Sequence, residues 1–296
     1  MSRGRRAAGV LAGSLVAAVL LMGALWRFAP GFMGWFGLWR AFSAVGLERE
    51  VVAVDGRSVG IAHGGDGKAM VMLHGHATDK RAFLAYAPQW RERWSILLVD
   101  LPLHGDSGPA SAEGRSASVA DLAALLDERA IQRVTLIGQG LGAELALAHA
   151  LEHPDQVEKL VLLAPTGLAP LGVEEDRLYP DDETGVDALV QLLYGELEIP
   201  PGLRRQLIAE RLELGTREQA WTITVHAEPP LDPSALKVPT LAVFGTADAL
   251  VPSEAERALD TLDHVELHRL DGCPHVVSGD CLQQTLRLMH AFIDPD

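Results

Sequence analysis

From residue 69 onward, short and almost continuously apolar stretches alternate with segments of helical periodicity. They are AMVMLHG (69–75), SILLVDLP (95–102), RVTLIGQG (133–140), EKLVLLAP (158–165) and TLAVFG (240–245), and a further strand is expected at HVELHRL (264–270). A strand that is apolar throughout must be covered on both faces, as in parallel sheets whose crossover helices pack above and below. The sequence therefore predicts an α/β fold with a doubly wound, mostly parallel sheet.

Two shorter segments before this region, REVVAVDG (49–56) and SVGIAHGG (58–65), alternate between apolar and polar residues and are separated by Asp55-Gly56. This dipeptide is typical of a tight hairpin turn, so two antiparallel strands are expected to open the domain. Helices are expected at 119–129, 141–152, 253–261 and 281–292, where apolar residues recur with helical spacing.

No strand is expected between residues 166 and 239. VDALVQLLYGEL (186–197) and GLRRQLIAERLEL (202–214) have helical periodicity, whereas VEEDRLYPDDETGVD (173–187) is an acidic loop with seven carboxylates and one arginine. A helical insertion between two strands predicts a lid at the carboxyl edge of the sheet, where such folds bind ligands. The acidic loop is expected to be solvated, and it would disfavour anionic substrates if it borders the entrance.

The N-terminus is a separate segment. Residues 7–26 are an uncharged run of 20 residues, preceded by Arg3, Arg5 and Arg6. A helix of this length reaches roughly 30 Å, the thickness of the hydrocarbon layer of a membrane. A cleaved signal peptide is the alternative, but the run is longer than a usual apolar region and no small-x-small cleavage motif ends it. Residues 1–26 are therefore predicted to be a membrane anchor that precedes the globular domain at 46–296.

Residues 27–45 follow the predicted anchor and are rich in aromatic residues. Seven of the chain's sixteen aromatic residues lie between Trp26 and Phe42, and Arg27 and Arg40 lie among them. Such a segment suits the headgroup zone of a membrane, and a helix docked on the globular domain is the alternative. Three arginines before the span and two after it favour a cytoplasmic N-terminus and a globular domain on the outer side of the membrane.

Charge and cysteine content exclude several functions. The formal net charge of −15 and the absence of a basic cluster beyond the N-terminus argue against a nucleic-acid partner. Cys273 and Cys281 are too few for a disulfide framework or a thiolate metal site. They can pair if the domain is exported, but their spacing alone does not decide this, and two free, partly buried thiols are the expectation. His74, His76 and His104 have no carboxylate or thiol at ligand spacing, so no metal and no other cofactor is expected.

Four motifs in this order resemble those of the α/β-hydrolase family, and the resemblance spans about residues 48–292. LHGHATD (73–79) is similar to the family's oxyanion loop, and DLPLHGDSG (100–108) to its DLPGHGxS segment. FGTADALVP (244–252) is similar to the turn that carries the acid, and LDGCPHVV (270–277) to the loop that carries the histidine. The resemblance implies an α/β-hydrolase fold with a helical lid at about 166–239.

The resemblance also implies site residues. It makes Asp248 the carboxylate that orients an imidazole and His275 the base, and it places the backbone oxyanion donors at His76 or Ala77 and at Leu141. His74 is expected to hold the oxyanion loop through hydrogen bonds. At the elbow, where the family has GxSxG, this sequence reads Gly138-Gln139-Gly140-Leu141-Gly142. A glycine at position 140 has no atom that attacks a carbonyl, and neither Gln139, Thr135 nor Thr166 is an obvious substitute.

Three explanations of Gly140 stay open. The chain is a non-catalytic binding protein, for which the N-Myc downstream-regulated proteins are a similar case. Alternatively, Asp248 and His275 act as an acid–base pair on a bound water or substrate, as in family members with lyase or oxygenase chemistry. In the third explanation Gly140 is an engineered or erroneous replacement of a serine, and the natural protein is an ordinary esterase-like hydrolase. The interpretation adopted is a membrane-anchored relative of serine esterases that binds a small apolar molecule such as an ester and lacks the serine nucleophile. The sequence does not show whether the chain has a protein partner.

Overall fold

The computed structural model describes residues 40–196, 201–276 and 279–295. The chain divides into two units, residues 1–47 and residues 48–296. In the first unit residues 40–44 are helical, and the N–H of Leu47 donates to the carbonyl of Phe42 (2.9 Å). The predicted membrane span at 7–26 and most of the aromatic segment lie outside the described residues. Within the described part, no helix is both long enough and apolar enough to cross a membrane.

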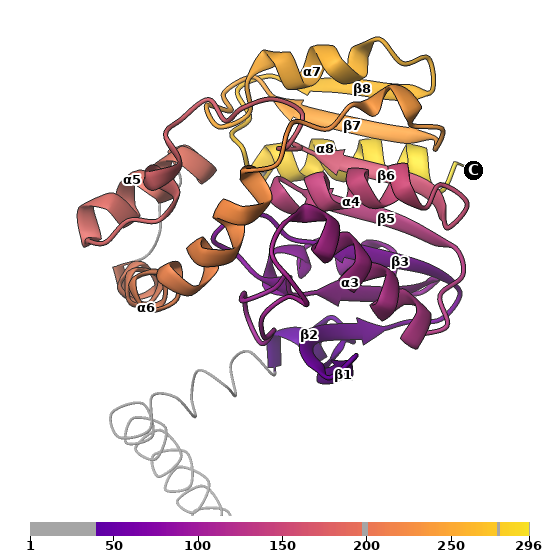
Figure 1. The fold of residues 1–296 in the computed structure, drawn as a ribbon, viewed down its shortest axis with the longest axis horizontal. Coiled ribbons are helices and arrows are strands. Elements are labelled where there is room, and N and C mark those ends of the chain that lie inside the picture. The colour runs from indigo at the N-terminus through magenta and orange to yellow at the C-terminus, as the bar shows by residue number, and fades with distance from the viewer. Residues whose placement is uncertain (1–39, 197–200, 277–278, 296) are drawn as a thin grey trace, which may run out of the picture. The chain divides into compact units, whose positions relative to one another are not determined.

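The second unit is built around an eight-stranded sheet with the strand order β1-β2-β4-β3-β5-β6-β7-β8 (Figure 1). The strands are β1 (Glu48–Val54), β2 (Arg57–Gly64), β3 (Lys68–Leu73), β4 (Trp94–Val99), β5 (Val134–Gln139), β6 (Val157–Leu163), β7 (Thr240–Gly245) and β8 (Val265–Leu270). Strand β2 is antiparallel to both of its neighbours, and the other paired strands are parallel. The predicted α/β fold with a mostly parallel sheet is therefore confirmed.

The hairpin of β1 and β2 turns at Asp55 and Gly56, as the dipeptide predicts. Both residues have positive φ angles, 49° and 77°, and Val54 pairs with Arg57 across the turn. A two-residue turn with two positive φ angles matches the right-handed twist of the flanking strands. This local geometry explains why an Asp-Gly dipeptide is found here.

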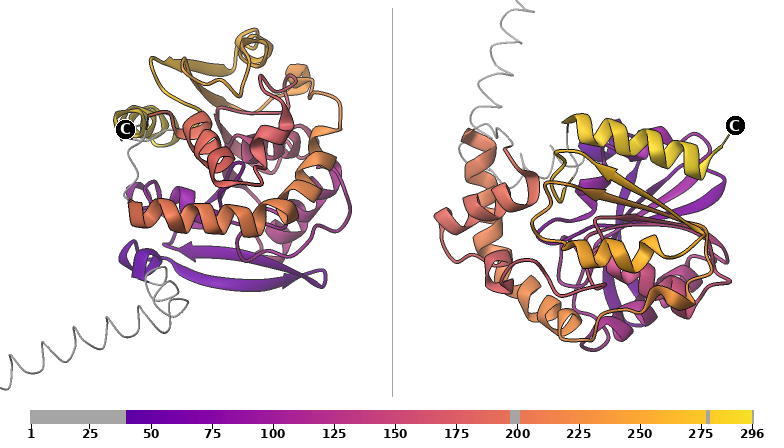
Figure 2. Two further views of the ribbon diagram at one scale, coloured as in Figure 1. Left: turned by 90° about the vertical axis from the view of Figure 1, so that its left-hand side faces the viewer. Right: turned by 90° about the horizontal axis from the view of Figure 1, so that it is seen from above.

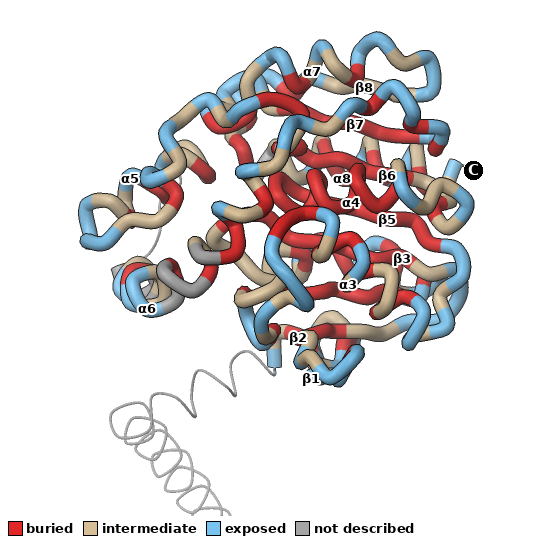
Figure 3. The backbone as a smooth tube through the Cα atoms, in the orientation of Figure 1, coloured by how far each residue is buried: buried red, intermediate tan, exposed pale blue. Residues whose placement is uncertain are grey.

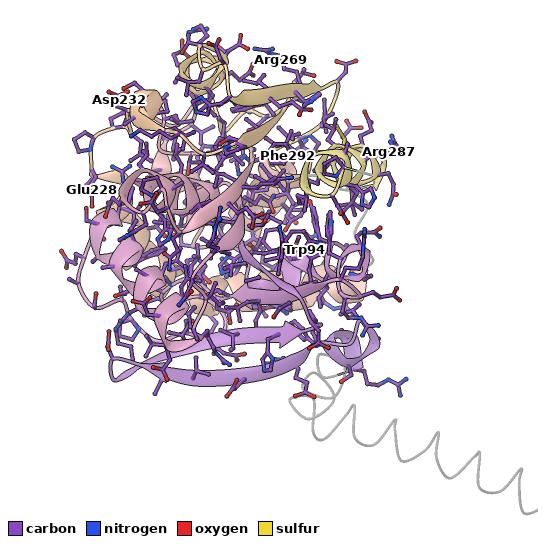
Figure 4. All side chains as sticks on the ribbon, turned by 90° about the vertical axis from the view of Figure 1, so that its right-hand side faces the viewer. Trp94, Glu228, Asp232, Arg269, Arg287 and Phe292 are labelled. Atoms are coloured by element: carbon purple, nitrogen blue, oxygen red, sulfur yellow. A yellow bond between two sulfur atoms is a disulfide. The ribbon has the colours of Figure 1, made fainter. Side chains whose placement is uncertain are left out.

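Helices cover both faces of the sheet. Helices α3 (Arg115–Glu128), α4 (Leu141–Glu152) and α7 (Ser253–Asp260) lie on one face and α8 (Gly279–Ile293) on the other (Figure 2). All six residues of β5 are buried, as are all but the last two residues of α4 (Figure 3). The hydrophobic core therefore lies around the central strands of the sheet. The end of α8 is fixed by Lys159 of β6, whose Nζ donates to the carbonyls of Phe292 (2.7 Å) and Ile293 (3.0 Å); Phe292 is labelled in Figure 4.

The segment between β6 and β7 is the predicted helical insertion. It contains the short 3₁₀ helices η3 (Glu175–Leu178) and η4 (Pro233–Ala235) and the α-helices α5 (Glu183–Tyr194) and α6 (Pro201–His226). Helix α6 continues twelve residues beyond the predicted segment at 202–214, because Trp221 and Val225 in its last turns are buried in the core. The N–H of Val276 donates to the carbonyl of Leu193 (2.7 Å), which joins α5 to the loop that follows β8. The insertion therefore lies at the carboxyl ends of the strands.

Candidate functional site

The elbow is a sharp turn between β5 and α4, and its flanking glycines are required by packing. A Cβ at Gly138 would lie 2.3 Å from the carbonyl oxygen of Gly142, and a Cβ at Gly142 would lie 2.1 Å from that of Leu73. Gly140 itself has φ 53° and ψ −115°, a conformation that glycine adopts more easily than other residues. Its N–H donates to the carbonyl of Leu163 (2.9 Å) on the neighbouring strand. The backbone of the elbow therefore forms this turn and its hydrogen bond with no side chain at position 140.

Asp248 and His275 form a buried hydrogen-bonded pair. Nδ1 of His275 lies 2.9 Å from Oδ2 of Asp248, and both side chains are almost fully buried. The other carboxylate oxygen, Oδ1, accepts from the backbone N–H groups of Leu250 (2.8 Å) and Val251 (3.1 Å). Because the carboxylate is fixed by these two donors, it holds the imidazole with Nδ1 as donor and Nε2 free to accept a proton.

The free edge of the imidazole faces the elbow. A Cβ built on Gly140 would lie 2.8 Å from Nε2 of His275 and 3.7 Å from Cα of Gly75. The structure therefore brings together three segments that the sequence analysis singled out: the elbow, the acid turn and the histidine loop. Nε2 of His275 has no hydrogen-bond partner among the described residues.

The loop after β3 is held beside the elbow by His74. Its Nδ1 donates to the carbonyl of Gly75 (2.9 Å), and its Nε2 accepts from the backbone N–H of Leu101 (2.9 Å). Burial and the nearby His104 lower the pKa of His74 to about 3, so the ring is neutral and keeps one tautomer. In this loop Ala77 has a positive φ of 52°, and Leu141 is the first residue of α4. The predicted oxyanion donors therefore lie on the two segments beside Gly140.

A cluster of ion pairs and hydrogen bonds joins this loop to the loop after β4. Nζ of Lys80, which is buried, contacts the carboxylate of Asp100 and lies 2.7 Å from Oδ2 of Asp106. The backbone N–H groups of Lys80 and Asp106 each donate to Asp100 (both 2.8 Å). Paired and fully hydrogen-bonded charges are the form in which buried ions are tolerated, so this cluster fixes the two loops together.

A cavity of about 220 Å³, open to solvent, lies between the insertion and the loop after β3. Its apolar wall is formed by α5 and α6 through Leu189, Val190, Leu193 and Leu207. Its polar wall contains two arginines, and both are paired: Arg81 with Asp79 and Glu210, and Arg211 with Glu218. Sequence reasoning missed these ion pairs, because Arg81 and Glu210 lie 129 positions apart and no motif joins them.

The histidine loop is also closed by a disulfide bond. Cys273 and Cys281 are bonded, with their Cα atoms 5.8 Å apart. The expectation of two free thiols is wrong, because Cys281 of α8 lies beside Cys273. The carbonyl of Cys273 also accepts from the N–H of Ala247 (3.0 Å), next to Asp248. Among the described residues, no group of three or more His, Cys, Asp or Glu side chains is arranged to hold a metal ion.

Comparison with known proteins decides the family. The family model described as the alpha/beta hydrolase family matches residues 70–286. The chain belongs to the α/β-hydrolase family. The match extends from β3 to α8, so it includes all four motifs and the elbow.

Relatives in this family are hydrolases. A 2-hydroxy-6-oxononadienedioate/2-hydroxy-6-oxononatrienedioate hydrolase of Cupriavidus pinatubonensis is 26% identical over 282 residues, which cover 86% of this chain and 98% of that protein. A pimeloyl-[acyl-carrier protein] methyl ester esterase of Vibrio cholerae is 27% identical over 215 residues, which cover 67% of this chain and 83% of the esterase.

Solved structures share the fold. A bacterial membrane phospholipase A superposes with a TM-score of 0.84 at 22% identity, covering 96% of this chain and 97% of the phospholipase. A carboxylesterase from Bacillus subtilis superposes with a TM-score of 0.75 at 18% identity, covering 88% of this chain and 98% of the esterase.

Proposed function

We propose that this α/β-hydrolase hydrolyses a small, apolar ester by activating water directly, without a covalent intermediate on residue 140. The hydrogen bond between Asp248 and His275 carries this proposal, because it leaves Nε2 directed at the position where a nucleophile would act. In this role Nε2 of His275 takes a proton from water, and the backbone N–H groups of Ala77 or His76 and of Leu141 stabilise the oxyanion. A general base of this kind contributes about 10²- to 10⁴-fold to a rate.

Loss of the nucleophile does not remove every source of catalysis. In serine proteases the oxyanion hole and binding alone retain about 10³- to 10⁴-fold over the reaction in water. In this chain the acid, the base and the oxyanion loop are all held by buried hydrogen bonds. A site that was used only for binding would not need a carboxylate with both oxygens fixed toward an imidazole and its own backbone turn.

The cavity supports an apolar substrate. Four aliphatic side chains of α5 and α6 line the cavity, and its two guanidinium groups are already paired with carboxylates, so neither is available for a free anion. One of the relatives, the pimeloyl-[acyl-carrier protein] methyl ester esterase, acts on an ester. A neutral ester with a short or medium aliphatic chain fits these linings best.

The test is hydrolysis of short aryl esters by the full-length protein and by His275→Ala. Turnover by the wild-type chain is expected, and His275→Ala is expected to lower kcat/KM by about 100-fold because the base is lost. The matched control is His290→Ala, which removes an exposed histidine from α8. An inactive wild-type chain, or turnover that His275→Ala leaves unchanged, contradicts the proposal and favours a protein that binds without chemistry.

We further propose that residues 7–26 anchor the chain in a membrane, with the globular unit on the outer side. The disulfide between Cys273 and Cys281 supports this location, because such bonds persist in oxidising compartments. The arginines before and after the span support the same orientation. A membrane phospholipase A with this fold indicates that the fold is compatible with membrane proteins.

Fractionation of the full-length protein in a bacterial expression host tests the anchor. Recovery in the membrane fraction after a carbonate wash, and digestion of the globular unit by protease added to spheroplasts, are the expected results. A soluble protein whose mass corresponds to a start after residue 26 identifies a cleaved signal peptide instead. Protection from external protease contradicts the outer location.

A further inference from the structure

His275 lies inside a loop that a disulfide bond closes. Cys273 precedes His275 by two residues and is fully buried, and Cys281 lies in the first turn of α8. The chain contains these two cysteines and no others. The imidazole that the proposed reaction uses as its base is therefore carried by a segment that is covalently joined to α8.

The same cysteine joins the histidine loop to the acid turn. The carbonyl of Cys273 accepts from the N–H of Ala247 (3.0 Å), which precedes Asp248. A Cβ at Gly245 would lie 2.1 Å from the carbonyl oxygen of Cys273, so the two segments pack together with no space for a side chain between them. The position of Cys273 therefore sets how the segment that carries His275 lies against the segment that carries its carboxylate partner.

Helix α8 holds the other end of the bond in place. Thr285 and Ile293 of this helix are buried, and Nζ of Lys159 donates to its last carbonyls. Oγ1 of Thr285 donates to the carbonyl of Cys281 (2.9 Å) within the helix. Because α8 is packed on the sheet, a bond to Cys281 fixes Cys273 relative to the sheet and not only relative to a neighbouring loop.

The ring of His275 depends on the backbone that carries it. Among the residues that the structure describes, Nδ1 has one partner, Oδ2 of Asp248 (2.9 Å), and Nε2 has none. A single hydrogen bond leaves the ring free to follow any movement of its loop. A displacement of about 1 Å at a reacting group costs about 100-fold in rate, so small movements of this loop matter for catalysis.

We propose that the bond between Cys273 and Cys281 positions His275, so that the chain hydrolyses esters only after this bond has formed. This inference rests on the proposed ester hydrolysis and adds a condition to it. The two cysteines are positioning residues, because they act through the imidazole and take no part in the reaction itself. Such bonds form in oxidising compartments, so activity would begin only after export of the globular unit.

Formation of the bond is an oxidation by another disulfide, R–S–S–R, such as oxidised glutathione. The thiolate of one cysteine attacks a sulfur of the oxidant and displaces the first R–SH, and the second cysteine then attacks the mixed disulfide and displaces the second R–SH. Two hydrogen atoms pass from the two cysteines to the oxidant, which leaves as two thiols. Cys281 is partly exposed and Cys273 is fully buried, so Cys281 is the residue that meets the oxidant.

The test compares ester hydrolysis by the oxidised and the reduced wild-type chain at room temperature. A phosphine cleaves the bond and is removed before the assay, and a thiol titration checks that the free thiols rise from none to two. Reduction is expected to lower kcat by at least about 10-fold and to leave KM within about threefold, because the cavity walls on α5 and α6 are untouched. Oxidised glutathione is expected to restore the rate.

Controls separate the position of His275 from the stability of the fold. Circular dichroism checks that every form is folded at the assay temperature. Cys273→Ser with Cys281→Ser is expected to have the low rate of the reduced chain and to ignore the phosphine. The matched control is Leu286→Ala, which removes a buried side chain from α8 but keeps the bond, and it is expected to unfold at a lower temperature with an unchanged kcat. A folded reduced chain or double variant with the full rate overturns the proposal.

An oxidised chain that hydrolyses no ester contradicts the proposed function, and proton NMR then decides the positioning role separately. The Nδ1 proton of His275, which is bonded to Asp248, is expected to give a signal at low field that is missing in His275→Ala. Reduction of the disulfide is expected to broaden or remove this signal, and reoxidation to restore it. A signal that is identical in both forms, or that is missing from the oxidised chain, overturns the positioning role.

Discussion

Nε2 of His275 lies so close to Gly140 that a Cβ at position 140 would be only 2.8 Å from it. Real Cβ atoms do not approach a nitrogen this closely, so any side chain at position 140 requires the imidazole to withdraw by several tenths of an ångström. The positive φ of Gly140 adds backbone strain of about 1–3 kcal/mol for a residue with a side chain. The imidazole of His275 can therefore lie this close to the elbow because residue 140 is a glycine.

Restoring a hydroxyl at the elbow is expected to restore a covalent nucleophile. In Gly140→Ser, Oγ would lie between the elbow and Nε2 of His275, so we expect labelling by a fluorophosphonate probe and a gain in aryl ester hydrolysis of at least about 100-fold. Gly140→Ala is the matched control, because it has the same strain and the same Cβ but no oxygen. Equal behaviour of the two variants would show that His275 cannot withdraw far enough to activate Oγ.

Asp248→Asn is expected to lower kcat by about 10²- to 10⁴-fold while leaving KM within threefold of the wild-type value. The reason is that an amide at this position no longer holds Nδ1–H of His275, whereas the cavity walls on α5 and α6 are untouched. Steady-state kinetics on the same ester measure both constants. The control is Asp260→Asn, which removes an exposed carboxylate near Arg269 (3.6 Å). A rise in KM with unchanged kcat would assign Asp248 to binding.

The fold and the elbow could be predicted because their signals are local. Apolar runs define the buried strands, and Gly138 and Gly142 lie where a Cβ would clash with the backbone between β5 and α4. The resemblance of the acid turn and the histidine loop to the family's motifs also predicted that Asp248 and His275 meet. Helix α6 was predicted too short, because its last turns owe their helical form to the burial of Trp221 rather than to periodicity.

The rest of the site comes from segments that are distant in sequence. His226 ends α6 of the insertion and lies beside His76 of the loop after β3 and Glu144 of α4. No sequence motif indicates these contacts, because the three residues lie far apart in the chain. The disulfide is a similar case. A separation of eight residues between Cys273 and Cys281 is compatible with free thiols or with a bond. The position of α8 in the fold decides between them.

The disulfide is expected to stabilise the second unit. A bond that closes a loop of this length contributes about 2–3 kcal/mol by restricting the unfolded chain. The double variant Cys273→Ser with Cys281→Ser should therefore unfold several degrees below the wild type in a thermal scan. A phosphine reductant supplies the control, because it should lower the midpoint of the wild type to that of the variant and leave the variant unchanged. A wild type that ignores the reductant contradicts the bond's contribution.

Acid sensitivity is expected from His149, which is buried in α4 with Nε2 2.8 Å from Oε1 of Gln156. Burial lowers the pKa of His149 from 6.5 to about 4. The unfolded chain therefore binds a proton near pH 6.5, whereas the folded chain binds it only near pH 4. Between these values the unfolded state holds more protons, so the free energy of unfolding falls as the pH falls, by at most about 1.4 kcal/mol per pH unit.

His149→Gln isolates this contribution, because glutamine can still donate to Gln156 but does not titrate. Urea unfolding at pH 7, 6 and 5 is expected to show a wild-type advantage that shrinks by about 2 kcal/mol across the series. His74 contributes in the same direction but is common to both proteins, so it cancels in the difference. His290→Gln, at an exposed position on α8, should run parallel to the wild type. Parallel curves for His149→Gln as well would mean that His149 is protonated in the folded chain already near neutral pH.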